Sequence, residues 1–160
     1  MASQTTRTTA VGKRPVRHDG YDKVTGKALY GADTNLPGML HGRILRSPHA
    51  HARIISINTG KAEAHPEVHS VITNSDFPPQ KNESVAAIPG PAINLKQQTD
   101  NILAGSKVLY KGHPIAAIAA TSTHAAEEAM GLIEVEYDVL DSVATAEDAI
   151  ADGATLLHEE

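Results

Sequence analysis

The sequence contains no cysteine and no tryptophan, and aromatic residues make up only 3% of its 160 positions. The absence of cysteine excludes disulfides, cysteine-ligated zinc, iron–sulfur ligation and thiol catalysis within this chain. With a single phenylalanine, the core has to be built mainly from isoleucine, valine, leucine and alanine. Hydrophobic residues still reach 41%, which predicts a folded chain of a length suited to one domain.

Long apolar runs and net positive charge are missing as well. No stretch approaches the ~20 apolar residues that a membrane span requires. Residues 1–15 lack the apolar centre of a secretory signal. The formal net charge of −5 argues against nucleic acid as the main partner. We therefore expect a cytoplasmic protein with no membrane or nucleic-acid partner, and a mobile polar tail over residues 1–10.

The hydrophobic pattern predicts several short strands and a few short helices, which is an α+β organisation. Strands are expected over residues 27–33, 39–47, 52–58, 68–73, 107–111, 114–120 and 133–139. Helices are expected near residues 59–66, 122–130 and 144–152. In the second predicted helix, Ser122 or Thr123 can cap the N-terminus and Gly131 can end it.

Two further expectations concern how these segments are arranged. The strand–helix–strand order over residues 114–139 suggests that the two strands lie parallel in one sheet. Ile55 and Ile57 alternate with polar neighbours, which predicts that both face the core. Residues 77–101 contain four prolines without a sustained period, so we expect an irregular loop there, and loops of that length are usually functional or covered by a partner.

Nine histidines in 160 residues raise the question of a metal site, most directly in the stretch "LRSPHAHARI". His49 and His51 have the spacing that places two ligands on one face of a strand. Pro48 instead places His49 in a turn, and the neighbouring arginines would repel a cation. His41 lies roughly 16 Å away along an extended strand. We favour a turn histidine beside one that is hydrogen-bonded to backbone.

The other candidate groups have equally simple explanations. The alternating acids Glu134, Glu136 and Asp138 oppose an apolar face, which is typical of a solvated strand face rather than of catalytic carboxylates. Ser47 and Ser122 occupy turn and helix-start positions and lie outside any G-x-S-x-G motif. The turn before the predicted helix lacks the glycines of a phosphate-binding loop.

The stretch "DKVTGKALY" could form a ligand-contacting loop through Lys23 and Gly26, although a tight turn with an exposed lysine explains it as well. From the residues alone, we assign no catalytic, cofactor-binding or metal-binding residue.

The order of the segments closely resembles the large subunit of molybdenum hydroxylases, the xanthine dehydrogenase and aldehyde oxidase family. The resemblance covers residues 11–160 and identifies an α/β-hammerhead domain with a mixed β-sheet and a few short helices. His113 stands where many relatives have glutamine. The matching stretches are "KVTGKALYGAD" (23–33), "RSPHAHARI" (46–54), "YKGHPIAAIAA" (110–120) and "EVEYDVL" (134–140).

The resemblance implies an oxidoreductase that hydroxylates a carbon with oxygen derived from water. Substrates in the family include aldehydes, N-heterocycles, purines and aromatic thioesters. It further implies a molybdopterin cofactor in later domains of the large subunit, with iron–sulfur clusters and FAD on other domains or subunits. None of these groups is expected on this chain, whose partners would be the molybdopterin-binding domain and the iron–sulfur and flavin subunits.

Three functions therefore stay open at this point. The first is a structural or docking domain of a molybdenum hydroxylase large subunit that is inactive alone. The second is a free-standing interaction module with the same fold. The third is a small metal-binding protein that uses the histidines.

Overall fold

The structure is a computed structural model that describes residues 12–79, 81, 85–86 and 93–158. The tail expected over residues 1–10 lies outside the described residues. The chain groups into two units, residues 1–37 and residues 38–160, and each is described by itself.

In the first unit, none of the described residues is buried. It contains a short helix, α1 (Gly20–Val24), and one 3-10 turn, η1 (Gly31–Asp33). The Tyr30 N–H donates to the Asp33 carboxylate at 2.9 Å and closes that turn. The strand expected over residues 27–33 is therefore wrong, since this local bond takes a donor that a strand ladder would use. Lys23 lies over the Tyr30 ring at 5.5 Å.

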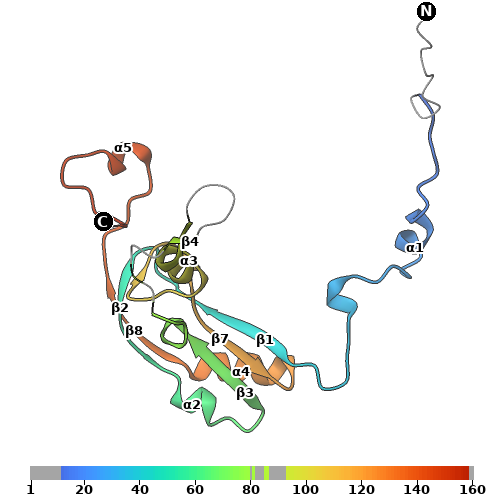
Figure 1. The fold of residues 1–160 in the computed structure, drawn as a ribbon, viewed down its shortest axis with the longest axis horizontal. Coiled ribbons are helices and arrows are strands. Elements are labelled where there is room, and N and C mark those ends of the chain that lie inside the picture. The colour runs from blue at the N-terminus through green and yellow to red at the C-terminus, as the bar shows by residue number, and fades with distance from the viewer. Residues whose placement is uncertain (1–11, 80, 82–84, 87–92, 159–160) are drawn as a thin grey trace, which may run out of the picture. The chain divides into compact units, whose positions relative to one another are not determined.

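The second unit is built on two three-stranded antiparallel sheets (Figure 1). Sheet A has the order β1-β7-β3, and sheet B has the order β6-β2-β8. The strands of sheet A are β1 (His41–Arg46), β7 (Pro114–Ala120) and β3 (Val68–Thr73). Those of sheet B are β6 (Lys107–Val108), β2 (Ala52–Asn58) and β8 (Glu134–Val139).

The α+β class is confirmed, but the parallel arrangement expected over residues 114–139 is wrong. β7 and β8 belong to different sheets, and every pairing described is antiparallel, in place of one mixed sheet. The helix between them, α4 (Thr123–Leu132), packs against β1 and β7 and so delivers the chain to the other sheet. The crossover rule applies only to strands that share a sheet.

Small residues allow α4 and α2 (Gly60–Glu63) to pack tightly on one face of sheet A. Ala116 and Ile118 of β7 and Ala129 of α4 are buried in the same cluster, which also takes up Leu45 of β1. A second buried cluster, centred on Ile115 and Val108, packs against the inner side of sheet B. The core therefore consists of aliphatic side chains, as the shortage of aromatic residues requires.

A β-bulge changes which side chains of β2 face this core. Ile54 pairs with Tyr137 and Ser56 pairs with Glu136, so Ile55 is the extra residue. Ile54 and Ile57 pack on the core, whereas Ile55 is 58% exposed. The expectation that Ile55 faces inward is therefore wrong.

The segment expected to be irregular over residues 77–101 contains a helix, α3 (Leu95–Ile102), and that part of the prediction is wrong. The Asn94 side chain accepts from the Gln97 N–H at 3.0 Å and caps the helix. Lys96 and Asp100 form an i, i+4 ion pair along it at 2.7 Å. These polar local interactions support a helix whose apolar residues are only Leu95 and Ile102, two turns apart.

The remaining elements are short. They are the 3-10 turn η2 (Asn74–Asp76), the two-residue strands β4 (Val85–Ala86) and β5 (Ile93–Asn94), and α5 (Ala146–Ala149). Ser122 caps α4 as expected, accepting from the Ala125 N–H at 3.1 Å, but Gly131 lies inside the last turn instead of ending the helix. Across the described residues, no helix is both long and apolar enough to cross a membrane.

Candidate functional site

The stretch around Ser47 joins the end of β1 in sheet A to the start of β2 in sheet B. Ser47 is buried, and its N–H donates to the His113 carbonyl at 2.9 Å. Its own carbonyl accepts from the Gly112 N–H at 3.0 Å. The Ser47 hydroxyl accepts from the His49 N–H at 3.0 Å, which folds the turn that Pro48 initiates. Ser47 therefore ties the turn to the strand that follows Gly112.

His51 is 2% exposed and holds the beginning of β2 against the segment after β8. Its Nδ1 lies 2.8 Å from the Asp141 carbonyl, which can only accept, so Nδ1 carries the proton. The His51 carbonyl in turn accepts from the Leu140 N–H at 3.0 Å. Nε2 is buried without a hydrogen-bond partner among the described residues. The sequence-based interpretation, a histidine bonded to backbone, is confirmed, and the ring is more deeply buried than expected.

His113 is completely buried and connects three parts of the chain. Its Nδ1 accepts from the Leu109 N–H at 3.2 Å, and its Nε2 donates to the Asp100 carbonyl at 2.8 Å. The Tyr110 ring stacks on it with centroids 4.4 Å apart. Burial lowers the pKa of His113, although the Asp100 carbonyl and carboxylate act in the opposite direction. The ring is therefore a neutral donor and acceptor that clamps α3 to the turn before β7.

The structural role of His113 was missed at the sequence level, where it was noted only as a departure from the family's glutamine. A signal was present, because it directly follows Gly112, whose φ of +87° marks a tight turn. It also directly precedes the most apolar strand of the chain, so a polar side chain there needs internal partners.

His49 and His51 do not act together. The His49 ring meets Tyr137 edge-on at 5.0 Å between centroids, on β8. Burial raises the pKa of Tyr137, and a hydrogen bond with Ser47 opposes that rise. His41, at the other end of β1, lies 3.1 Å from the Thr123 hydroxyl. Among the described residues, no group of three or more histidine, aspartate or glutamate side chains is arranged to hold a metal ion.

The acidic row of β8 lies on the outer face of sheet B, with all three carboxylates exposed. Glu134 pairs with Lys61, and Glu136 accepts from Ser56 at 3.3 Å. These are the contacts of a solvated sheet face, as the alternation of charge predicts.

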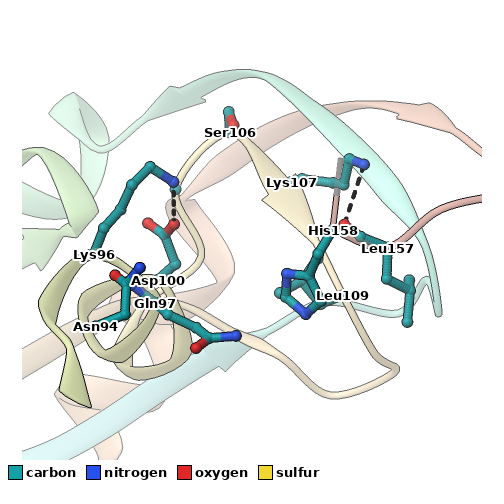
Figure 2. Close-up of a pocket in the computed structure, with 10 residues that line it drawn as sticks. Asn94, Lys96, Gln97, Asp100, Ser106, Lys107, Leu109, Leu157 and His158 are labelled. Atoms are coloured by element: carbon teal, nitrogen blue, oxygen red, sulfur yellow. Dashed lines mark hydrogen bonds and ion pairs between the residues drawn. The ribbon is translucent and has the colours of Figure 1, made fainter. Parts of the chain in front are cut away.

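A hollow of about 360 Å³ in the second unit lies between α3, β6 and the end of the described chain (Figure 2). Lys96 pairs with Asp100 on one side of it. On the other side, Lys107 Nζ donates to the carbonyls of Leu156 and Leu157, each at 3.3 Å. Both lysines are therefore already bonded to groups of this chain. The hollow is explained by the fold and does not require a ligand.

Comparison with known proteins agrees with this geometry. The family model described as "Aldehyde oxidase and xanthine dehydrogenase, a/b hammerhead domain" matches residues 25–141. A probable xanthine dehydrogenase subunit from Bacillus subtilis is 39% identical over 145 residues, which are 91% of this chain and 18% of that protein. The carbon monoxide dehydrogenase large chain of Afipia carboxidovorans is 37% identical over 135 residues, 84% of this chain and 16% of the relative.

Solved structures give the same result. A Cu,Mo-CO dehydrogenase matches with a TM-score of 0.75 and 33% identity, over 92% of this chain and 18% of that one. An aldehyde oxidoreductase from Desulfovibrio gigas matches with a TM-score of 0.72 and 29% identity, over 89% of this chain and 16% of its own. The chain thus spans less than a fifth of the length of these relatives. It belongs to the α/β-hammerhead domain family of aldehyde oxidase and xanthine dehydrogenase, found in the large chains of molybdenum-containing oxidoreductases.

Proposed function

We propose that this chain is a docking domain of a molybdenum hydroxylase large subunit and is not catalytic alone. The observation that carries the proposal is that its buried polar side chains are bonded to the backbone of the chain. Ser47, His51 and His113 are each hydrogen-bonded to backbone groups at the junction of the two sheets. Such bonds fix the fold and do not face a substrate. The assembled enzyme would hydroxylate an aldehyde, N-heterocycle, purine or aromatic thioester.

The cofactor that the family implies is molybdopterin, and two relatives are named for molybdenum or molybdopterin. The described residues do not fit that group. The lysines that line the hollow beside α3 are bonded to Asp100 and to backbone carbonyls, so they do not converge on its centre. We therefore place no step of the reaction on this chain, and assign molybdopterin, iron–sulfur clusters and FAD to its partner domains and subunits.

The proposed extent of the domain is residues 11–160. The family match over residues 25–141 supports treating the two units as one domain, because that match crosses the division between them at residues 37 and 38. For the assembled enzyme we propose a cytoplasmic location, which cell fractionation would test.

Docking is tested by expressing the chain with and without the remainder of the large subunit from the same organism. We expect the two to purify together in equal amounts. Hydroxylase activity toward the substrate classes above should be found in the pair and not in the chain alone. Recovery of the chain by itself from cells that also make the remainder would contradict the proposal and would favour a free-standing module.

Hydrogen exchange gives a second test. We expect amides over residues 78–94 to exchange rapidly in the isolated chain and slowly in the complex, because this proline-rich stretch would be covered by the rest of the enzyme. Residues 80, 82–84 and 87–92 of it lie outside the described part of the structure. Equal exchange in both states would oppose a covered surface there.

A further inference from the structure

The two faces of sheet A differ sharply. One face carries α4 and α2, and its side chains enter the buried core. The other face is made of cross-strand neighbours that no helix covers within the described residues. Ile44 of β1 and Ile72 of β3 both pair with Ala117 of β7, so the three side chains lie in one row. A second row consists of Gly42, Ala119 and Ser70.

These six positions form what we call the open face of sheet A, and they include no charged residue. Arg46, two residues after Ile44 on β1, is exposed at the edge of this face and donates through Nη1 to the Gly112 carbonyl at 2.9 Å. Ile44 is 43% exposed and Ile72 is 40% exposed, so two branched apolar side chains stand in water on either side of an alanine. A sheet that faces water on one side normally alternates apolar residues inward with polar residues outward. The open face does not follow this rule.

Sheet B provides a comparison within the same molecule. The cross-strand pairs on its outer face are Arg53 with Asp138, Ser56 with Glu136 and Asn58 with Glu134. These pairs follow the rule for a solvated sheet, and the exposed Ile55 of β2 is the bulged residue between them. The contrast is informative because both sheets have three strands, so the lack of charged cross-strand neighbours on the open face is specific to sheet A.

We infer that the open face of sheet A is where this domain docks onto the remainder of the large subunit, through an uncharged, apolar surface of that remainder. The inference rests on the proposed function. Two observations select this occupant. In the relatives, more than four-fifths of the length lies outside the matched region, so the matched domain has a large remainder of the same subunit to dock onto. The alanines and the glycine of β7 and β1 leave room for close approach of a partner element between the two isoleucines.

The test uses the 160-residue chain and, as the probe, the remainder of the large subunit from the same organism. We would compare Ile44→Glu and Ile72→Glu on the open face with Ile55→Glu, which makes the same change at a more exposed isoleucine on sheet B. A carboxylate buried in an apolar interface without a partner is strongly unfavourable. We expect roughly 100-fold weaker binding for the two open-face variants, and a change below roughly threefold for the control.

Thermal unfolding of each variant establishes that it folds. The two open-face substitutions lie on separate strands, so the comparison can still be made if one of these variants does not fold. Equal binding by all three variants would place the docking site elsewhere and overturn this inference while leaving the proposed function intact. Absence of binding by the unmodified chain would overturn both. Sedimentation velocity tests whether a second copy of this chain occupies the open face instead. A self-dimer that Ile44→Glu abolishes would show that it does, and this result would also overturn the inference.

Discussion

His113 gives the sharpest test of how the junction holds the fold together. Replacing it with alanine would leave the Leu109 N–H and the Asp100 carbonyl without partners in a buried site. Each unsatisfied group costs about 1–3 kcal/mol, and the lost ring adds a cavity. We therefore expect His113→Ala to lower the free energy of unfolding by about 3–5 kcal/mol. That is a large part of the 5–15 kcal/mol typical of a folded domain.

His113→Gln is the matched control. A glutamine amide carries an acceptor and a donor, so it can accept from Leu109 and donate to Asp100 as the neutral imidazole does. We expect it to cost less than about 1.5 kcal/mol at pH 7.5. Urea denaturation followed by circular dichroism would measure both variants. Equal destabilisation by the two substitutions would refute the idea that paired hydrogen bonds are what His113 contributes.

The same pair of variants isolates the effect of pH. Burial lowers the pKa of His113 in the folded chain below its ordinary value of 6.5. As pH falls below 6.5, the unfolded chain binds a proton before the folded one, so stability is lost on acidification. The effect reaches at most about 1.4 kcal/mol at pH 5.5. We expect unmodified protein to lose up to this much more stability than His113→Gln between pH 7.5 and 5.5, and parallel pH profiles would refute the assignment.

Two local features give further expectations, each measurable by the same urea titration. Ser122→Ala removes the cap that accepts from the Ala125 N–H and should cost about 1 kcal/mol; no change would mean that the cap contributes nothing. Gly112→Ala forces a side chain onto a φ of +87° and should cost roughly 1–2 kcal/mol. Gly131→Ala is its control, since a Cβ there meets nothing within 4 Å and should stabilise α4 by up to about 1 kcal/mol. Similar effects of the two glycine substitutions would contradict the strain argument.

The elements that could be predicted from the sequence are those with a clear period. β8 alternates strictly and β7 is a continuous small-residue run between turn signals, and both were expected within one or two residues. α3 was missed because Leu95 and Ile102 are its only apolar residues, and the cap at Asn94 and the ion pair between Lys96 and Asp100 that support it give no apolar signal. Helices are predicted from apolar residues that recur along one helix face, and this pattern does not reveal local polar bonds of this kind.

The pairing of strands was harder to predict from the sequence. The bulge at Ile55 depends on the register of β2 against β8, which neither strand specifies alone. Likewise, β7 and β8 read as a parallel pair until their actual neighbours are known. The junction was only partly visible: His51 was expected to bond to backbone, but which carbonyl it meets depends on Asp141, 90 positions away along the chain.

The junction and the open face are connected by the energetics of association. A partner gains most from a surface that does not need to be ordered on binding, because ordering side chains and loops subtracts from affinity. Ser47 and His113 together fix the start of β7, the central strand of sheet A, relative to the end of β1. His51 does the same for the entry to sheet B. These buried polar groups therefore contribute to docking indirectly, by holding Ile44 and Ala117 in one rigid row, so His113→Ala should weaken docking beyond its effect on folding whereas His113→Gln should not.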